Sequence, residues 1–306
     1  MKIYVPPIKC QGIKTKLVPW IKLHAELSPE GRWIEPFMGS GVVGFNIRPS
    51  RALFTDANPH IINFYNAIKE GYITHGKAKA FLEKEGALLT QKGEEHYYMI
   101  RERFNNDSDP FDFLFLSRAC FNGVIRFNKK GLYNVPFGHK LERFAQAYVT
   151  KITNQIKYVE SAIKQYDWSF SCADFRDAID EATEKDFLYF DPPYIGRHTD
   201  YYSSWSDRDE EELFNSLLTT PAKFILSTWH SNQYRHNLML ARHASRFNVF
   251  TKEHFYHVGA SEANRSSMME AIVLNYLPQS ITQDQSNTTE EVTQLKLLEQ
   301  RPVEYR

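Results

Sequence analysis

Short apolar runs alternate with longer amphipathic stretches along most of the chain. A short apolar run bounded by turn-forming or charged residues is typical of a buried strand. Because helical patterns separate most of these runs, the sequence predicts an α/β fold with a mostly parallel sheet. The expected strands are Arg32–Glu35, Ala52–Thr55, Trp168–Cys172, Phe187–Phe190, Lys223–Ser227, Phe247–Glu253 and Glu270–Asn275.

The pattern changes between residues 66 and 157, where helical periodicity with charged and aromatic faces dominates. We therefore expect an α/β domain formed by residues 1–65 and 158–278, interrupted by a mainly helical domain over residues 66–157. Residues 279–306 are polar and of low complexity. They are expected to form a tail with a short helix near Val292–Gln300.

Composition excludes several classes of protein. A chain of 306 residues, 42% of them hydrophobic, can bury a large core and is not a disordered protein. No apolar run approaches the roughly 18–20 residues that a membrane helix needs. The N-terminal segment MKIYVPPIKC lacks the apolar core of a signal peptide, so we expect a cytoplasmic protein. Cys10, Cys120 and Cys172 are too widely spaced for a disulfide framework or a zinc pattern, and no metal site is expected.

Charge is balanced over the whole chain but not along it. The 37 basic and 37 acidic residues cancel, yet Phe113–Lys157 holds eight lysines and arginines against the single acid Glu142. The first 34 residues carry six basic residues against two acidic ones. Runs of charge are usually solvated faces, but this local imbalance favours a polyanionic partner, and nucleic acid is the expected one.

A glycine-rich turn follows the first expected strand. The segment Glu35–Gly44, EPFMGSGVVG, has the glycines that allow a tight turn and leads into a helix whose first N–H groups can face a ligand. The acid at the end of the next strand is Asp56, where a carboxylate binds ribose hydroxyls of either a dinucleotide or an S-adenosyl cofactor. An ordinary strand–helix turn with a helix-capping aspartate is the alternative interpretation.

The segment Asp191-Pro192-Pro193-Tyr194 follows the apolar strand Phe187–Phe190. Proline cannot extend a central strand, so the chain leaves the sheet at the carboxyl end of that strand, where open α/β sheets bind ligands. The Asp191 carboxylate and the Pro192 carbonyl can accept both hydrogens of an exocyclic base amine. Tyr194 offers a face on which a purine can stack. A simple loop-terminating turn would leave the preceding aromatic strand and the glycine turn unexplained.

The order EPFMGSG, DAN and DPPY resembles that of the Dam-type DNA N6-adenine methyltransferases (D12 class, alpha group). Lys9–Lys14 is similar to the N-terminal cofactor motif of that family. Phe121–Asn128 and Gly131–Gly138 are similar to its target-recognition region. Cys172–Phe175 lies where these enzymes contact the adenine of the cofactor, and the similarity spans about residues 5–277.

The resemblance implies a Rossmann-like methyltransferase domain with a mainly helical inserted target-recognition domain. It implies S-adenosylmethionine as the methyl donor, S-adenosylhomocysteine as the product, and a flipped adenine in double-stranded DNA as the substrate. The implied catalytic residues are Asp191, Pro192, Pro193 and Tyr194. The implied cofactor-binding residues are Cys10, Lys14, Glu35, Pro36, Phe37, Gly39, Ser40, Gly41, Asp56, Asn58, Asp174, Phe175 and Asp191. The implied DNA-binding residues are Phe121, Asn122, Val124, Arg126, Asn128, Lys129, Lys130 and Pro136.

By this resemblance, Lys14 would contact the methionyl carboxylate, Asp56 the ribose, and Asp174 the cofactor adenine. Arg126 would read a base edge, as an arginine fork suits guanine in the major groove. Three positions depart from the family pattern. Cys10 stands for its tryptophan, Ile13 for its second glycine, and Phe121 for its usual tyrosine.

Other functions remain open from the sequence alone. Methyl transfer to cytosine N4 or to an RNA adenine would use a similar site, although serine in place of Asp191 is more usual for cytosine. A nicotinamide-dependent oxidoreductase would use the glycine turn but leave Asp191–Tyr194 unexplained, and a catalytically silent DNA-binding module would not need that segment. The aromatic cluster Tyr201–Trp205 fits either a core or a lid over the base. A GATC-like target and a separately encoded restriction endonuclease are further expectations.

Overall fold

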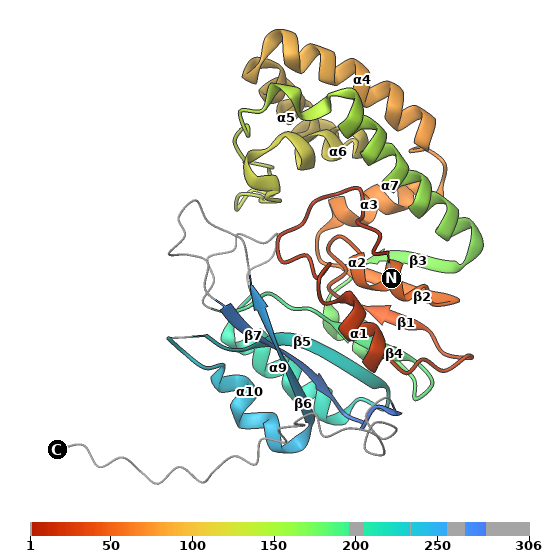
Figure 1. Cartoon of the computed structure of the whole chain (residues 1–306), viewed down its shortest axis with the longest axis vertical. Helices are drawn as coiled ribbons and strands as arrows, with labels where there is room; N and C mark the ends of the chain where they lie inside the picture. Colours follow the sequence, from red (N-terminus) through yellow and green to blue (C-terminus); the bar gives the residue numbers. More distant parts are fainter. Residues whose placement is uncertain (1, 196–204, 233, 256–266, 280–306) are drawn as a thin grey trace, which may run out of the picture.

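The computed structural model describes residues 2–195, 205–232, 234–255 and 267–279. In this part of the chain a seven-stranded sheet has the order β3-β2-β1-β4-β5-β7-β6 (Figure 1). Neighbouring strands from β3 to β5 are parallel, whereas β7 is antiparallel to both β5 and β6. The predicted α/β class is confirmed. The strands are β1 (Trp33–Glu35), β2 (Arg51–Asp56), β3 (Asp167–Cys172), β4 (Phe187–Phe190), β5 (Lys223–Ser231), β6 (Asn248–Phe255) and β7 (Ser267–Leu274).

Alternate side chains of each strand point to opposite faces of the sheet. Helices cover both faces, and each face contributes to its own core cluster. In β4, Phe187 and Tyr189 join one core cluster, and Leu188 and Phe190 join the other. The first cluster lies under α1 (Val18–His24), α2 (Val42–Ile47) and α3 (Pro59–Lys69). The second lies under α8 (Phe175–Asp180), α9 (Asp207–Thr219) and α10 (Leu238–His243).

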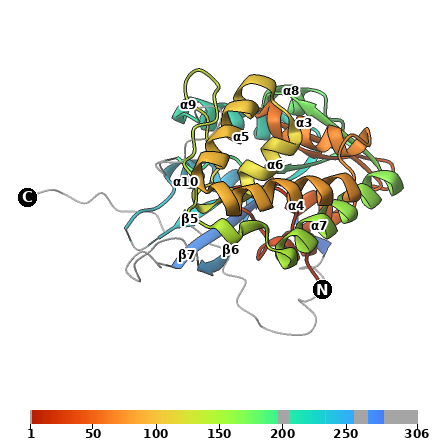
Figure 2. The same cartoon turned by 90° about the horizontal axis from the view of Figure 1, so that it is seen from above.

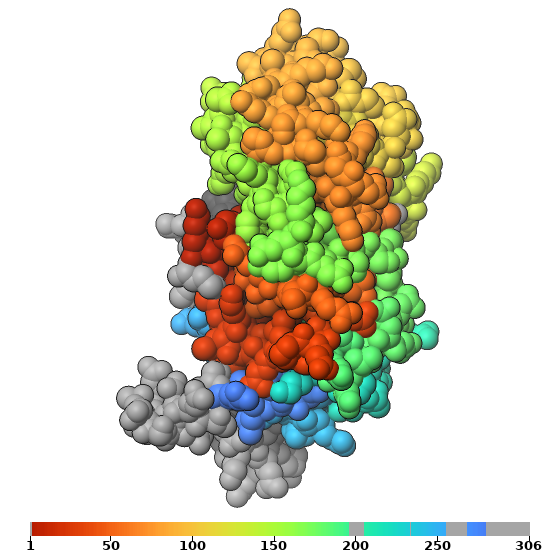
Figure 3. Space-filling model, turned by 90° about the vertical axis from the view of Figure 1, so that its right-hand side faces the viewer, coloured from red at the N-terminus to blue at the C-terminus, as the bar shows by residue number. Residues whose placement is uncertain are grey.

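A helical part stands above this sheet in Figure 1 and consists mainly of α4, α5, α6 and most of α7. Viewed from above, α4 and α7 run side by side, and the two helices also contact each other (Figure 2). The space-filling view shows this part, coloured orange to green, stacked on the red N-terminal segments (Figure 3). The four helices are α4 (His75–Lys92), α5 (Glu94–Asp107), α6 (Pro110–Ala119) and α7 (Gln146–Gln165).

Two helices connect the parts. The expected boundaries at residues 65/66 and 157/158 fall inside α3 and α7, and both helices contact β3. The inserted region is therefore attached through continuous helices rather than through flexible linkers. The division into two domains stays a prediction.

A β-hairpin-like segment links α6 to α7. Isolated bridges pair Cys120 with Phe137 and Phe127 with Tyr133. The side chain of Asn105 on α5 accepts a hydrogen bond from the Tyr133 backbone N–H at 2.8 Å and donates one to its carbonyl at 3.1 Å. This two-sided contact fixes the hairpin to the helices behind it.

Gly31, just before β1, provides a test of the packing. A Cβ atom on this residue would lie 1.7 Å from the backbone carbonyl oxygen of Lys185. Because backbone cannot move aside as a side chain can, we expect Gly31→Ala to lower the free energy of unfolding by about 1–3 kcal/mol. Gly76→Ala in α4 is the matched control, since apart from its own helix backbone and its chain neighbours nothing lies within 4 Å of its Cβ position. Urea unfolding of both variants measures the difference, and equal stabilities would contradict the packing at Gly31.

Candidate active site

The glycine turn between β1 and α2 forms one wall of the site. Gly39 and Gly41 have φ angles of 48° and 73°, in the left-handed region that favours glycine. Gly41 is the N-cap residue of α2, and the Met38 backbone N–H donates to the Thr55 carbonyl of β2 at 3.0 Å. The turn is thus held open at the carboxyl end of β1, with Pro36, Ser40 and Gly41 buried.

The Glu35 side chain stabilises this turn through hydrogen bonds. Its Oε2 atom accepts hydrogen bonds from the Trp33 indole N–H at 2.8 Å and from the Gly44 backbone N–H at 3.0 Å. The side chain is almost fully buried, and this burial raises the pKa of Glu35 to about 8. Glu35 therefore braces the start of α2.

Asp56 performs a similar function from the end of β2. Its two carboxylate oxygens accept hydrogen bonds from the backbone N–H groups of Gly39 and Asn58, each at 2.8 Å. Burial raises the pKa of Asp56 to about 6. Asn58 in turn caps α3 by accepting from the His60 N–H at 3.0 Å. Cys10 lies against this turn, since a Cβ atom on Gly39 would be 3.9 Å from the Cys10 Cβ.

Asp191 lies directly after β4 and forms an ion pair with Lys14, whose Nζ is 2.8 Å from Asp191 Oδ1. Lys14 is only 4% exposed although it comes from the N-terminal segment. Its Nζ also lies 4.8 Å from the centre of the Tyr194 ring, a cation–π contact. Burial raises the pKa of Asp191, and the charge of Lys14 opposes that rise.

The carboxyl ends of β1, β2 and β4 bring these groups to one edge of the sheet. Between β1 and β4 the strand order reverses direction, which makes this the topological switch point where open α/β sheets bind ligands. The glycine turn, Asp56 and Asp191 all lie at this point. Three separate sequence motifs thus contribute to a single site.

An aromatic cluster extends the site toward α8. The Phe37 and Phe175 rings stack with centroids 5.6 Å apart, and Trp205 packs edge-on against Phe37 at 5.4 Å. Of the cluster Tyr201–Trp205, only Trp205 lies in the described residues, and it belongs to this packing. Asp174 is the N-cap of α8 and pairs with Arg176 at 2.9 Å, so its carboxylate has a local structural partner.

The predicted DNA-contacting residues lie on the hairpin after α6. Phe121 is 51% exposed, and Asn122, Lys129, Lys130 and Pro136 are exposed as well. The hairpin is a scaffold that presents these side chains to solvent.

Other predicted residues of the hairpin have contacts within it. The Asn128 side-chain oxygen accepts from the Lys130 and Leu132 N–H groups and shapes the tip. Arg126 is half-buried and donates from Nε to the Asn134 side-chain oxygen at 2.9 Å. Val124 is half-buried, and its carbonyl accepts from the Tyr133 hydroxyl at 3.2 Å.

Two features of the site are not among the residues predicted from the sequence. Glu270 on β7 is completely buried and accepts a hydrogen bond from the Tyr194 hydroxyl at 2.7 Å. Lys9 packs its stem against Gly123 of the hairpin, and burial together with the charges of Arg143 and Arg118 lowers the pKa of Lys9 to about 8. The position of Lys9 inside the N-terminal motif could have suggested its importance, but nothing near Glu270 in the sequence could have done so.

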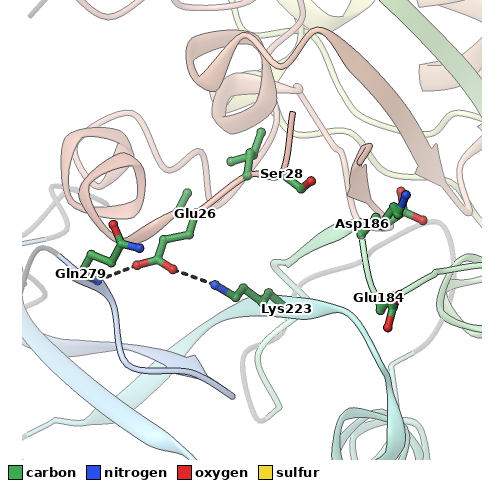
Figure 4. Close-up of a pocket in the computed structure, with 9 residues that line it drawn as sticks. Glu26, Ser28, Glu184, Asp186, Lys223 and Gln279 are labelled. Carbon is green, nitrogen blue, oxygen red and sulfur yellow. Dashed lines mark hydrogen bonds and ion pairs between the residues drawn. The ribbon is translucent and has the colours of Figure 1, made fainter. Parts of the chain in front are cut away.

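A separate hollow lies at the opposite edge of the sheet, near the starts of β4 and β5 (Figure 4). Its main charged groups already have partners. Glu26 accepts from Lys223 at 2.8 Å and from the Gln279 backbone N–H at 2.5 Å. Lys185 pairs with Glu30 at 2.5 Å. This hollow is best explained as a surface feature held by ion pairs.

Neither a metal centre nor a membrane span is found in the described part of the chain. No three histidine, cysteine or acidic side chains there are grouped so that they could hold a metal ion. No helix among the same residues has the length and apolar character needed to cross a membrane. Residues 280–306 of the C-terminal tail, including the predicted helix near Val292–Gln300, lie outside the described residues.

Residues 11–263 match the family model of the D12 class N6 adenine-specific DNA methyltransferases. The match covers most of the chain, so this protein belongs to that family and is an adenine-specific DNA methyltransferase. The resemblance seen in the sequence is confirmed. The family description specifies DNA and the N6 position of adenine, in agreement with the methyltransferase prediction rather than with the cytosine, RNA or oxidoreductase alternatives.

Curated relatives named DNA adenine methylase agree with this assignment. The Haemophilus influenzae protein is 34% identical over 197 residues, which is 62% of this chain and 63%, somewhat less than two thirds, of that protein. The Vibrio cholerae protein is 34% identical over 226 residues, covering 71% of this chain and 76% of the relative. The Salmonella typhi protein is 30% identical over 237 residues, covering 72% of this chain and 79% of the relative.

The raised pKa of Glu35 predicts a specific pH dependence of stability. The folded state holds a proton on Glu35 between its ordinary pKa of 4.5 and about 8, whereas the unfolded chain releases it. This stabilisation is complete below pH 4.5 and is lost as the pH rises through 8. Glu35→Gln mimics the protonated side chain and does not titrate. The free energy of unfolding of this variant, relative to that of the wild type, should therefore increase from pH 5 to 8, by at most about 1.4 kcal/mol per pH unit.

Urea unfolding at four pH values within that range measures the difference. All other titrating groups are shared by the two proteins and cancel in the comparison. A difference that does not change with pH would contradict the buried, protonated state of Glu35.

Proposed function

We propose that this protein transfers a methyl group from S-adenosylmethionine to the N6 amine of an adenine that has been rotated out of a specific double-stranded DNA sequence. The observation that carries the proposal is the position of Asp191 and Tyr194 at the switch point, beside the glycine turn. Family membership supports the reaction, and the geometry supports the choice of the residues that would perform it.

The proposed chemistry depends on the Asp191–Tyr194 segment. The lone pair of an adenine amine is delocalised into the ring, which makes the nitrogen a poor nucleophile. The Asp191 carboxylate and the Pro192 carbonyl would accept the two amino hydrogens and draw the nitrogen toward tetrahedral geometry. Its lone pair can then form the new N–C bond while the S–C bond of the donor breaks. The raised pKa of Asp191 also favours its acceptance of the proton that the amine releases.

The residues at the site fit the proposed cofactor. S-adenosylmethionine supplies an activated methyl group on a sulfonium and leaves as S-adenosylhomocysteine. Its amino-acid end carries one positive and one negative charge, and the Lys14–Asp191 pair offers the complementary charges 2.8 Å apart. Asp56 lies where ribose hydroxyls would be held, and the Phe37–Phe175 stack provides an apolar wall for the adenine ring.

We assign DNA recognition to the hairpin and the basic face around it. The exposed lysines at its tip have the flexible charges suited to phosphate, whereas Arg126 is held in a fixed orientation by Asn134. Rotating a paired base out of the duplex costs a few kcal/mol. Exposed Phe121 and Asn122 would contact the duplex near the vacated position. The target is a GATC-like sequence by the resemblance of the hairpin.

The cellular setting follows from the substrate. We expect the enzyme in the cytoplasm, in contact with the DNA that it methylates. A separately encoded restriction endonuclease that cuts the same sequence would be its functional partner, and the alternative is an enzyme that acts without one. Mapping of methylated adenines in DNA from an expressing host identifies the target sequence and tests the reaction itself.

Replacing Asp191 tests the chemistry. We expect Asp191→Ala to lower methyl transfer by at least ~10²–10³-fold, as when a strong transition-state contact is removed. Asp191→Asn, which keeps the shape and one acceptor oxygen, should also lose activity because it is neutral. Asp180→Ala at the exposed end of α8 is the matched control and should transfer methyl groups at the wild-type rate. Wild-type turnover by Asp191→Ala would rule out the assignment, and thermal unfolding verifies that each variant is folded.

Arg126 and Lys129 distinguish base reading from phosphate contact. A lost bidentate base contact costs ~1–3 kcal/mol of discrimination at one base pair, whereas a lost phosphate contact weakens all sequences equally and reduces the salt slope by about one. Arg126→Ala should therefore relax the preference at one base pair. Lys129→Ala should keep the preference and flatten the salt dependence.

The measurements are kcat/KM on cognate and singly substituted duplexes and DNA affinity at several salt concentrations. Equal loss of activity on every duplex for Arg126→Ala would show that Arg126 contacts phosphate, and its assignment as the base-reading residue would then be wrong.

A further inference from the structure

Glu270 is a fully buried acid at the centre of β7. It lies opposite Trp229 of β5 and Lys252 of β6 in the antiparallel part of the sheet. Burying a carboxyl group in a protein interior is unfavourable unless strong hydrogen bonds compensate for the lost water. The burial of Glu270 therefore requires a structural or functional explanation.

The partner of Glu270 belongs to the catalytic segment. The Tyr194 hydroxyl donates to Glu270 Oε2 at 2.7 Å, the usual length of an O–H···O hydrogen bond. Tyr194 follows β4, and β5 separates β4 from β7 in the sheet. The side chains of Tyr194 and Glu270 thus connect two strands that are not hydrogen-bonded to each other.

The Tyr194 ring is fixed on two sides. Its hydroxyl is held by Glu270, and its face is 4.8 Å from the Lys14 ammonium, which is paired with Asp191. A tyrosine ring that is held only by its backbone can turn about its side-chain bonds. With the hydroxyl anchored on β7, the ring keeps one orientation beside the Asp191 carboxylate.

We propose that Glu270 is a positioning residue for methyl transfer: by accepting the Tyr194 hydroxyl, it holds the ring at the angle at which the target adenine stacks with its amine at Asp191. This inference rests on the proposed function of the site. It assigns no contact between Glu270 and the substrate, because Glu270 acts through Tyr194. A small misorientation of a reacting group lowers the rate of the bound complex more than it lowers binding.

The test is a double-mutant cycle on Tyr194 and Glu270. Glu270→Ala removes the acceptor, and Tyr194→Phe removes the donor but keeps the ring. Each is expected to lower kcat by roughly ten-fold to a hundred-fold, the range for loss of a hydrogen bond to a charged group. KM for the cofactor should change much less. Because both variants break the same contact, the double variant should be no slower than the slower single variant.

Two further variants separate positioning from stability. Glu270→Gln retains an acceptor oxygen and should recover part of the activity lost in Glu270→Ala. Glu210→Ala removes another buried acid, on α9 and outside the site, and should leave kcat unchanged. Thermal unfolding of each variant verifies the fold.

The possible outcomes distinguish the positioning role of Glu270 from the methylation reaction itself. Losses that multiply in the double variant, or no loss in Glu270→Ala, would overturn the positioning role while leaving the reaction intact. A Glu270→Gln variant as slow as Glu270→Ala would also count against it. Absence of adenine methylation by the folded wild-type protein would instead overturn the proposed reaction, and the positioning role with it.

Discussion

The ion pair between Lys14 and Asp191 is the interaction on which the arrangement of the site depends. Two opposite charges withdrawn from water are tolerated only when they lie close together and have further polar partners, and these two are 2.8 Å apart. The pair joins the N-terminal segment to the end of β4. It also places the ammonium over the Tyr194 ring, so removal of Asp191 would leave a buried ammonium without its carboxylate partner beside that ring.

The remaining acids of the site brace the backbone. Glu35 and Asp56 together accept hydrogen bonds from the N–H groups of Gly39, Gly44 and Asn58, which fixes the turn at both ends. Their raised pKa values are the consequence of this burial. Both acids therefore stabilise the turn. At neutral pH Asp56, with a pKa of about 6, keeps negative charge at the place where a cationic donor would bind, whereas Glu35, with a pKa of about 8, is mostly protonated.

The sequence predicted the parts of the site that are local and could not predict those that depend on distant contacts. The strand Phe187–Phe190 was predicted with the bounds it has, because prolines and an acidic run delimit it. The pairing of Glu270 with Tyr194 depends on the antiparallel register of β7 against β5, which no local pattern encodes. β5 also extends to Ser231, four residues beyond its predicted end, because β7 pairs with that extension.

Asp174 also has a structural role, which the resemblance did not imply. The resemblance implied a contact with the cofactor adenine, but the chain around Asp174 also forms a capping box and an ion pair with Arg176, which in turn pairs with Asp209 on α9. A sequence motif identifies a residue type at a position and says nothing about its other partners.

The N-terminal segment joins the hairpin proposed for DNA recognition to the segment proposed for catalysis. Lys9 packs against Gly123 in this hairpin, and Lys14, five residues later, pairs with Asp191. A segment this short cannot shift at one end without affecting the other. The hairpin that presents Arg126 and the carboxylate that would accept the adenine amine are therefore held in a fixed relation by one stretch of backbone, in addition to the continuous helices α3 and α7. Under the proposed function, this connection would keep the hairpin that contacts the DNA in a fixed relation to the site that receives the base.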